Sequence, residues 1–474
     1  MKKLISVIVF IVAFASILFY RSTLREREVV ILSTNDIHAV IDHFPELVTA
    51  ANLCRDTVAT LLVDSGDRWT GNAFIDRTEG RLPIIELMNH VGYDVATLGN
   101  HEFDKGPALL QGAIEYANFP ILCANMQSNT NSLTTLPGSI TLKTRNGVKC
   151  FITGVVTNYD NGHPEGSDEV FADLNFSDPM EAAKSELKQH RADASISILL
   201  SHMGDKKDME FAAKGENYNI ILGGHTHTIT DTIVGNTTIG QTGRFLKRLG
   251  ATHIRIKGNR ITSVEYRNIP LEGYTKESAT IQIVNRIEND PILGAAVGSL
   301  AAPIPHTGFA NMITKCIAEA TNSQIGFYHY GGIRLPHHDA GNIKLATLYN
   351  LEPFASKIHT IIMTPQQIRT MIITKFNDTK NSKESHRVDL FSTTPYEIII
   401  DQNGEAVDVR FPNLRENRKY SVAISDYVGK KYESICGEKH TMHDILVVDE
   451  LLKLLSNQKQ TPVDNTAYQK ISKF

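Results

Sequence analysis

The stretch VVILSTNDIH, residues 29–38, joins an apolar run to a polar phrase, and the same arrangement recurs four more times. The other apolar runs lead into DSGD (64–67), GNH (99–101), SH (201–202) and GGHTH (223–227). Each run has the length and composition of a buried β-strand, and helix-like stretches such as 83–90 and 180–190 lie between them. This alternation predicts an α/β fold whose polar phrases share one rim, where α/β proteins usually place their ligands.

The length of 474 residues predicts more than one domain, and we expect two. The first domain is expected over 29–270, with a hairpin at 254–269 as its last element. A linker helix over 271–300 and a second domain over 301–474 would follow. The composition is that of a globular protein, with 42% hydrophobic and 21% charged residues and a net charge of −4. This balance lacks the basic excess of a nucleic-acid binder, so no nucleic-acid polymer is an expected partner.

Residues 1–28 read as a targeting segment. Lys2 and Lys3 precede an apolar run from Leu4 to Tyr20, as in an export signal. Because the apolar residues continue beyond the small residues Ala13 and Ala15, an uncleaved membrane anchor is the alternative to a cleaved signal peptide. Either interpretation predicts an exported protein, periplasmic or otherwise outside the cytoplasm, with a membrane tether in the second case.

The polar phrases supply a set of metal ligands. Two divalent metals that activate a water molecule and hold a phosphoryl group need about seven hard or borderline ligands. Asp36 and His38 alternate at the end of an extended run, which would place both side chains on one face. His225 and His227 repeat this spacing behind two glycines.

The remaining ligands come from three other phrases. Asp67 is the natural bridging carboxylate, and Asp64 is the competing choice. Asn100 can offer an amide oxygen, and His202 completes the second metal site. The neighbouring His101 would then point to the other side, toward the substrate.

These phrases, together with GNHEFD at 99–104, resemble the metallophosphoesterase signature in the order used by that superfamily. NHEFD combined with STNDIH at 33–38 is similar to the 5′-nucleotidase and UDP-sugar hydrolase family in particular, over about residues 29–450. The resemblance implies a four-layer α-β-β-α metallophosphoesterase sandwich with a second α/β C-terminal substrate domain.

The resemblance also implies how the ligands are shared between two divalent ions, zinc, manganese or similar. One ion would be held by Asp36, His38, Asp67 and His227, and the other by Asp67, Asn100, His202 and His225. His227 departs from the family pattern, because many members carry an amide residue there. An imidazole at this position favours zinc or manganese without removing the site.

The resemblance assigns the catalytic roles to His101 and Asp104. His101 is similar to the family's transition-state histidine, which hydrogen-bonds the phosphoryl oxygens, and Asp104 to the carboxylate that orients it. A charged imidazole beside developing negative charge lowers the barrier, and a nearby carboxylate fixes its tautomer. The expected reaction is in-line attack on phosphorus by a hydroxide that bridges the two metals.

The second domain carries two family-like phrases, GGIR at 331–334 and Pro353-Phe354. By resemblance Arg334 would grip a substrate phosphate or carboxylate, and Phe354 would form one face of a clamp around the nucleobase. The loop that supplies the second aromatic face in relatives is replaced by GKKY at 429–432. Tyr432 is therefore predicted to bind substrate as the replacement, with Tyr427 as the alternative.

The expected activity is that of a 5′-nucleotidase, a phosphoric ester hydrolase that acts on a small nucleotide or related phosphoester. The alternative enzymes are a 2′,3′-cyclic phosphodiesterase and a UDP-sugar pyrophosphohydrolase, which would use the same metals and a different pocket. A catalytically inactive surface binding protein is the alternative of another class. A complete ligand set together with His101 and Asp104 argues against it, because a decayed enzyme is expected to lose some of these residues.

Overall fold

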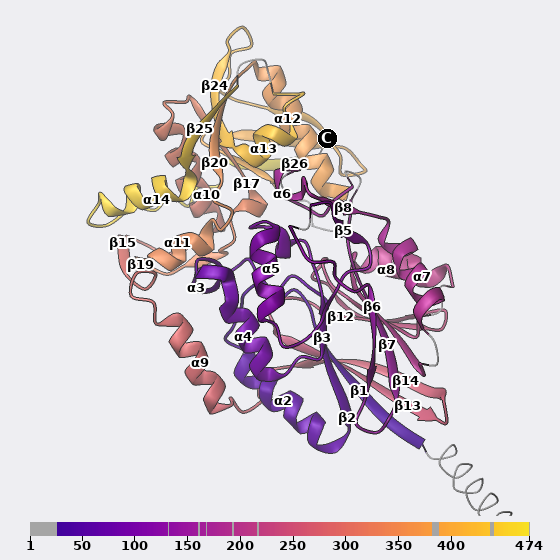
Figure 1. The fold of residues 1–474 in the computed structure, drawn as a ribbon. Coiled ribbons are helices and arrows are strands. Elements are labelled where there is room, and N and C mark those ends of the chain that lie inside the picture. Colours follow the sequence, from indigo (N-terminus) through magenta and orange to yellow (C-terminus); the bar gives the residue numbers. More distant parts are fainter. Residues whose placement is uncertain are drawn as a thin grey trace, which may run out of the picture. The chain divides into compact units, whose positions relative to one another are not determined.

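The computed structural model describes residues 26–130, 132–159, 162–166, 168–191, 194–215, 218–381, 388–436 and 440–473. The chain forms two compact units that divide between Glu288 and Asn289 (Figure 1). The predicted targeting segment, 1–28, lies outside the described residues except for its last three. Among the described helices, none combines the length and apolar character needed to cross a membrane.

Unit 1 is built on two six-stranded mixed sheets. The first sheet has the order β14 (Arg260–Pro270), β13 (Arg248–Lys257), β1 (Glu26–Thr34), β2 (Ala59–Asp64), β3 (Val95–Thr97) and β4 (Ile121–Leu122). The second has the order β11 (Ile229–Val234), β12 (Thr237–Thr242), β10 (Ile220–Gly223), β9 (Ile196–His202), β7 (Lys149–Val156) and β6 (Ser139–Lys143). A small ribbon pairs β5 (Met126–Ser128) with β8 (Leu174–Phe176).

Alternation along the strands explains why the sheets stack and are also covered by helices. In β1, Val29 and Ile31 pack between the two sheets, against residues such as Ile198 of β9. Val30 and Leu32 point the other way, into a core with the helices on the outer face of the first sheet. Both faces of β1 are therefore apolar, as expected for a strand buried on two sides.

The helices of unit 1 form the two outer layers. The outer core of the first sheet includes residues of α2 (Phe44–Thr57), α4 (Leu82–Val91), α5 (Pro107–Tyr116) and α9 (Ser278–Glu288). The outer core of the second sheet includes residues of α7 (Pro179–His190) and α8 (Asp205–Ala213). The short elements α3 (Ala73–Asp76), η1 (Glu79–Arg81), η2 (His101–Phe103) and α6 (Asp168–Phe171) lie in the connections. The α-β-β-α sandwich predicted for this part of the chain is confirmed.

Unit 2 contains a five-stranded sheet in the order β21 (Leu390–Ser392), β17 (Ile325–His329), β24 (Tyr420–Ser425), β20 (Lys357–Met363) and β25 (His440–Leu446). A three-stranded sheet has the order β23 (Ala406–Arg410), β22 (Tyr396–Ile400) and β26 (Gln469–Lys473). Two ribbons pair β15 (Ala296–Leu300) with β19 (Gly341–Lys344) and β16 (Ile304–Pro305) with β18 (His337–His338).

Helices cover both faces of the five-stranded sheet, as in an α/β domain. Tyr328 of β17 packs in one core with α10 (His306–Ala320), α11 (Leu345–Leu351) and α14 (Val447–Ser456). Its neighbour Phe327 points into the other core, which holds residues of α12 (Pro365–Asn381) and α13 (Asp426–Lys431). The short helix η3 (Tyr330–Gly332) follows β17 directly.

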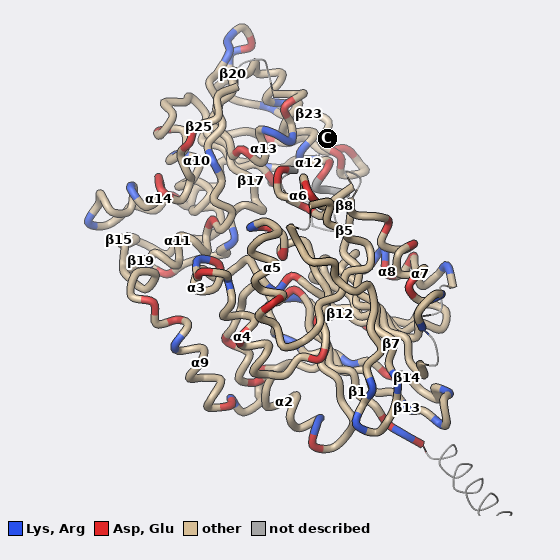
Figure 2. The backbone as a smooth tube through the Cα atoms, viewed as in Figure 1, with Lys and Arg blue, Asp and Glu red and all other residues tan. Residues whose placement is uncertain are grey.

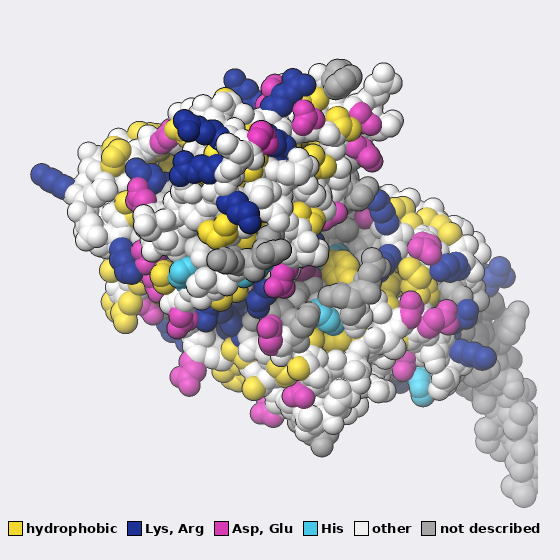
Figure 3. All heavy atoms as spheres, turned by 90° about the horizontal axis from the view of Figure 1, so that it is seen from above, with side chains coloured by type: hydrophobic (Ala, Val, Ile, Leu, Met, Phe, Trp, Pro, Cys, Tyr) yellow, Lys and Arg dark blue, Asp and Glu magenta, His cyan; other side chains and the backbone are white. Residues whose placement is uncertain are grey.

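The segment 271–300, predicted as a linker helix, contains helix α9 and strand β15. Val284 of α9 packs into the outer core of unit 1, whereas β15 pairs with β19 in unit 2. Acidic and basic residues are interspersed along both units (Figure 2). On the face drawn in Figure 3, hydrophobic side chains are scattered among charged and polar ones.

Candidate metal centre

The loops that follow β1 and β2 run beside each other and carry the first candidate ligands. The backbone N–H of Asp36 donates to the carbonyl of Gly66 over 2.9 Å, and that of His38 donates to the carbonyl of Asp67 over 3.0 Å. Asp36, His38 and Asp67 all have positive φ, of 50°, 49° and 57°. The prediction that Asp36 and His38 share one face of an extended strand is therefore wrong, because β1 ends at Thr34 and the chain turns left-handed.

The loop after β10 is built in the same way. His225 and His227 have φ of 79° and 55°, and the N–H of His225 donates to both carboxylate oxygens of Asp36, over 3.1 and 3.0 Å. A Cβ atom at Gly224 would lie 2.7 Å from His202 Nδ1, so a residue with a side chain does not fit there. Non-glycine residues in left-handed conformations cost about 1–3 kcal/mol each and cluster at functional sites.

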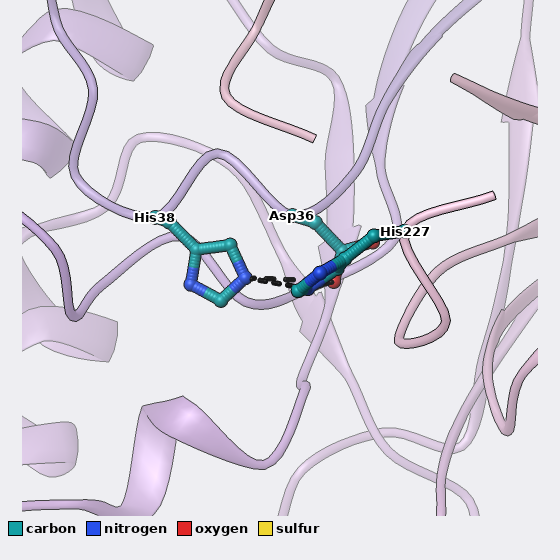
Figure 4. A group of neighbouring side chains, drawn as sticks. All are labelled: Asp36, His38 and His227. Atoms are coloured by element: carbon teal, nitrogen blue, oxygen red, sulfur yellow. Dashed lines mark hydrogen bonds and ion pairs between the residues drawn. The ribbon is translucent and has the colours of Figure 1, made fainter. Parts of the chain in front are cut away.

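Asp36, His38 and His227 form the first group of converging ligand atoms (Figure 4). His38 Nε2 lies 2.9 Å from His227 Nε2 and 3.9 Å from Asp36 Oδ1, and His227 Nε2 lies 3.4 Å from the same carboxylate oxygen. His38 Nδ1 donates to the carbonyl of Thr70 over 3.2 Å, which leaves the Nε2 lone pair directed into the group. A hydrogen bond that fixes the outer nitrogen is the usual support of a metal-binding histidine.

Asp67, His202 and His225 form the second group. His202 Nε2 lies 3.1 Å from Asp67 Oδ2, while its Nδ1 donates to the carbonyl of Ser65 over 2.6 Å. His225 Nδ1 lies 3.0 Å from the amide oxygen of Asn100. Asp67 also belongs to a third group, with His38 and His101, so its carboxylate lies between the other ligands. This position is the one expected of a bridging carboxylate.

The electrostatics of the histidines suit a cation. Burial lowers the pKa of His38 to about 3 and that of His225 to about 4, so both are neutral at pH 7 and offer lone pairs. Burial also opposes charge on His202, but the carboxylates of Asp67 and Asp36 raise its pKa to about 10. His202 Nε2 is fully buried, and the carboxylate of Asp67, 3.1 Å away, faces it, so a cation held between the two groups would replace the proton of the imidazole.

His101 and Asp104 lie beside these groups. His101 Nδ1 is 2.9 Å from Asp104 Oδ2, which also accepts the hydroxyl of Thr70. The N–H of His101 donates to Asp67 Oδ1 over 2.9 Å, and the His101 and His38 rings meet edge to face with centroids 5.2 Å apart. The carboxylate of Asp104 therefore fixes the imidazole at the border of the candidate metal centre.

A buried charge cluster that was not predicted underlies the ligand loops. The Glu102 carboxylate accepts the N–H groups of Asp67 and Arg68, both over 2.9 Å, and that of Gly99. The fully buried guanidinium of Arg68 lies 3.8 Å from Glu102 and 3.3 Å from Asp64. Asp64, the alternative bridging ligand, thus faces Arg68 and is in none of the three groups. An acidic residue directly after His101 was the available sequence signal for this cluster.

Tyr159 is a further site residue that sequence reasoning missed. Its hydroxyl forms a hydrogen bond with His225 Nε2, on the ring edge away from Asn100. The residue follows the end of β7, which is the position shared by the predicted ligands, so strand-end placement was the signal.

The predicted substrate residues lie in unit 2 and differ in exposure. Phe354 is 39% exposed, and the guanidinium carbon of Arg334 lies 5.7 Å from its ring centroid. Tyr432 is 3% exposed, and its hydroxyl donates to Asp378 Oδ2 over 2.8 Å within the unit 2 core. The prediction that Tyr432 contacts substrate is wrong, because its ring is used in packing. Tyr427, the alternative, is 40% exposed and lies against His329.

The sandwich and the carboxylate–imidazole cluster at its strand ends define the class, a metallophosphoesterase. Residues 29–228 match the family model of the calcineurin-like phosphoesterases, and residues 286–435 match that of the 5′-nucleotidase C-terminal domain. With both domains present in this order, the chain belongs to the 5′-nucleotidase family. Calcineurin-like phosphoesterases use divalent metals, and the predicted enzyme class, phosphoric ester hydrolase, is the class of this family.

Three relatives illustrate the similarity. The trifunctional nucleotide phosphoesterase protein YfkN of Bacillus subtilis is 25% identical, with 92% of this chain and 34% of the relative covered. The protein UshA of Yersinia enterocolitica is 23% identical, with 93% of each chain covered. A snake venom 5′-nucleotidase of Gloydius brevicauda is 30% identical, with 42% of this chain and 37% of the relative covered. The chain spans little more than a third of the length of two of these three relatives, the Bacillus subtilis and snake venom proteins.

Solved structures show the same fold. The 5′-nucleotidase precursor of Thermus thermophilus superposes with a TM-score of 0.79 at 16% identity, covering 94% of this chain and 99% of the other. A sulfate thiohydrolase SoxB, also of Thermus thermophilus, superposes with a TM-score of 0.73 at 15% identity, covering 94% of this chain and 96% of the other. Because a 5′-nucleotidase precursor and a sulfate thiohydrolase share this fold, the fold alone does not select the substrate.

Proposed function

We propose that the chain is a metal-dependent 5′-nucleotidase that releases phosphate from nucleotides. The observation that carries the proposal is the overlap of the three ligand groups of unit 1 at Asp67 and His38. One divalent ion would be held by Asp36, His38, Asp67 and His227, and the other by Asp67, Asn100, His202 and His225. His227 adds an imidazole to a site otherwise rich in oxygen, which favours zinc or manganese over magnesium.

Bound ions would lower the pKa of a water molecule and neutralise charge on the phosphoryl group. The chain itself supplies His101 as a hydrogen-bond donor for a phosphoryl oxygen. Its Nδ1 proton is directed to Asp104 Oδ2, so a protonated His101 presents Nε2–H to the substrate. The pKa of Asp104 is lowered despite burial, because His101 and the hydroxyl of Thr70 stabilise its charged form. Asp104 is therefore an anion that holds the imidazole in one orientation.

Unit 2 would recognise the rest of the nucleotide. The guanidinium of Arg334 is proposed to bind a phosphate or carboxylate oxygen, and the exposed ring of Phe354 is proposed to stack on the nucleobase. Tyr427 replaces Tyr432 as the candidate for a second aromatic contact, because its ring is accessible. We also propose that the chain is exported, since residues 2–20 have the charge and hydropathy pattern of an export signal.

Phosphate release from a panel of AMP, UDP-glucose and 2′,3′-cyclic AMP, with metal content measured on the same sample, tests this proposal. The metal-loaded protein is expected to hydrolyse AMP fastest. His101→Ala should lower kcat by about 100-fold or more without removing metal, because it deletes a contact made to the developing charge. His190→Ala is the matched control, since His190 is an exposed histidine at the end of α7. Equal activity of the His101→Ala variant and the control would disprove the catalytic role.

A 2′,3′-cyclic phosphodiesterase or a UDP-sugar pyrophosphohydrolase is the second candidate. It is favoured by the similarity to a trifunctional nucleotide phosphoesterase and by the loss of the predicted Tyr432 contact. Preference for the cyclic nucleotide or for UDP-glucose in the same panel would select it. No hydrolysis of any ester by metal-loaded protein would instead favour the inactive surface binding protein.

A further inference from the structure

Arg244 lies beside the candidate metal centre but is not one of its ligands. It stands in the loop between β12 and β13, and its Nη1 is 3.3 Å from His227 Nδ1. The side chain is exposed, whereas Asp36 and His38 are fully buried. Within the described ranges, no carboxylate forms an ion pair with Arg244. A basic group therefore faces solvent at the border of a buried, carboxylate-containing centre.

The loop around Arg244 is fastened to this centre. The N–H of Phe245 donates to the carbonyl of Asp36 over 2.8 Å, and the Phe245 ring meets the ring of His38 with centroids 5.9 Å apart. The guanidinium carbon of Arg244 lies 4.5 Å from the centroid of the same Phe245 ring. Phe245 and Leu246 have φ of 65° and 50°. Such conformations persist only where surrounding contacts hold them, so the loop places Arg244 in a defined position.

The contact with His227 shows how the guanidinium becomes available. Arginine only donates hydrogen bonds, so His227 Nδ1 must be the acceptor in this contact. If His227 instead offers its Nε2 lone pair to a cation, the proton moves to Nδ1, which then cannot accept from Arg244. A cation held at Nε2 of His227 would therefore leave the donors of Arg244 free to bind an anionic ligand.

We propose that Arg244 binds the phosphoryl group of the substrate at the rim of the metal centre. This inference rests on the proposed function and adds a phosphate-binding residue within unit 1. The planar fork of a guanidinium matches two oxygens of a phosphate, which makes arginine suited to this contact. In this arrangement, Arg244 orients the phosphoryl group that His101 and the metal ligands act on.

The test measures the affinity of the metal-loaded full chain for inorganic phosphate by titration calorimetry. Arg244→Gln is expected to weaken binding by about 10-fold, the effect of losing a charge-assisted hydrogen bond. Arg244→Lys should lie between this variant and the wild type, because it keeps the charge and loses the fork. Lys247→Gln is the matched control, as Lys247 is an exposed cation in the same loop, and should change the Kd by less than about twofold.

Bound metal is measured in every variant. Weaker phosphate binding in Arg244→Gln at unchanged metal content supports the inference. A Kd equal to that of the wild type, an equal loss in Lys247→Gln, or loss of metal together with phosphate would overturn it. Hydrolysis by the wild type is recorded separately. No hydrolysis defeats the proposed function, whereas hydrolysis with an unchanged phosphate Kd in Arg244→Gln defeats only this inference.

Discussion

Replacing Glu102 with glutamine should lower the free energy of unfolding of unit 1 and the metal affinity of the candidate metal centre. The Glu102 carboxylate accepts three backbone N–H groups, from Asp67, Arg68 and Gly99. A glutamine oxygen in the Oε2 position keeps two of them, but its NH2 group then faces the N–H of Arg68. The N–H of Arg68 is then buried without an acceptor, which lowers the free energy of unfolding by about 1–3 kcal/mol. The buried Arg68 also loses one of its two anionic partners, so we expect a total loss of about 4 kcal/mol, within the range for broken buried ion pairs.

The metal centre should respond because Glu102 joins the loop of Asp67 to the loop of Asn100. Supporting residues of this kind typically change metal affinity by about 10- to 100-fold. Calorimetric unfolding of the metal-free chain and titration with Zn²⁺ or Mn²⁺ measure the two effects. Glu115→Gln is the control, since Glu115 is exposed on α5 and, among the residues that the structure describes, bonds only to Gln111 one turn away. The reasoning would be refuted by a Glu102→Gln variant whose free energy of unfolding lies within about 1 kcal/mol of that of the control and whose metal affinity lies within about twofold.

Three more results are expected. Burial raises the pKa of Asp208 to about 7, so the folded state binds a proton that the unfolded state releases above pH 3.8, and stability is lost as the pH rises toward 7. The free energy of unfolding of Asp208→Asn relative to that of the wild type should therefore rise by about 3 kcal/mol between pH 5 and pH 8 in chemical unfolding. A difference between the two proteins that does not change with pH would contradict this. Because Asp67 raises the pKa of His202 to about 10 against the effect of burial, metal binding should release about one proton from His202 at pH 7. Calorimetry in buffers of different ionisation enthalpy detects that proton, and a buffer-independent enthalpy would speak against it. Tyr159→Phe removes the hydrogen bond to His225 and should lower metal affinity by about tenfold in a metal titration, whereas unchanged affinity would rule out this role.

The candidate metal ligands could be selected from the sequence because each follows an apolar strand. Parallel strands bring their carboxyl ends to one edge of a sheet, so Asp36 and Asp67, which follow the paired strands β1 and β2, could be expected to meet. His225 follows β10 of the other sheet, and its approach to Asp36 depends on how the two sheets stack. The local geometry could not be predicted in the same way. Asp36 and His38 look like alternating strand residues, but backbone hydrogen bonds to the loop of Gly66 and Asp67 hold them in left-handed conformations. Such tertiary contacts leave no periodic signal.

Burial of two side chains was also not predicted. No pattern in the sequence marks Arg68 as buried, yet the carboxylates of Asp64 and Glu102 make its complete burial tolerable. Tyr432 reads as part of a basic loop, although it stands four residues after Val428. That spacing places both side chains on one helical face, and both are buried. Attention to the spacing would have favoured a core role for Tyr432.

The amount of divalent metal bound by the purified chain tests the central claim most directly. Elemental analysis after equilibration with Zn²⁺ or Mn²⁺ and removal of free metal is expected to find about two ions per wild-type chain. Asp67→Asn should lower this number to about one or less, since Asp67 lies in two of the three ligand groups and is the proposed bridge. Wild-type protein that binds less than about one ion, or an Asp67→Asn variant that binds as many ions as the wild type, would contradict the account.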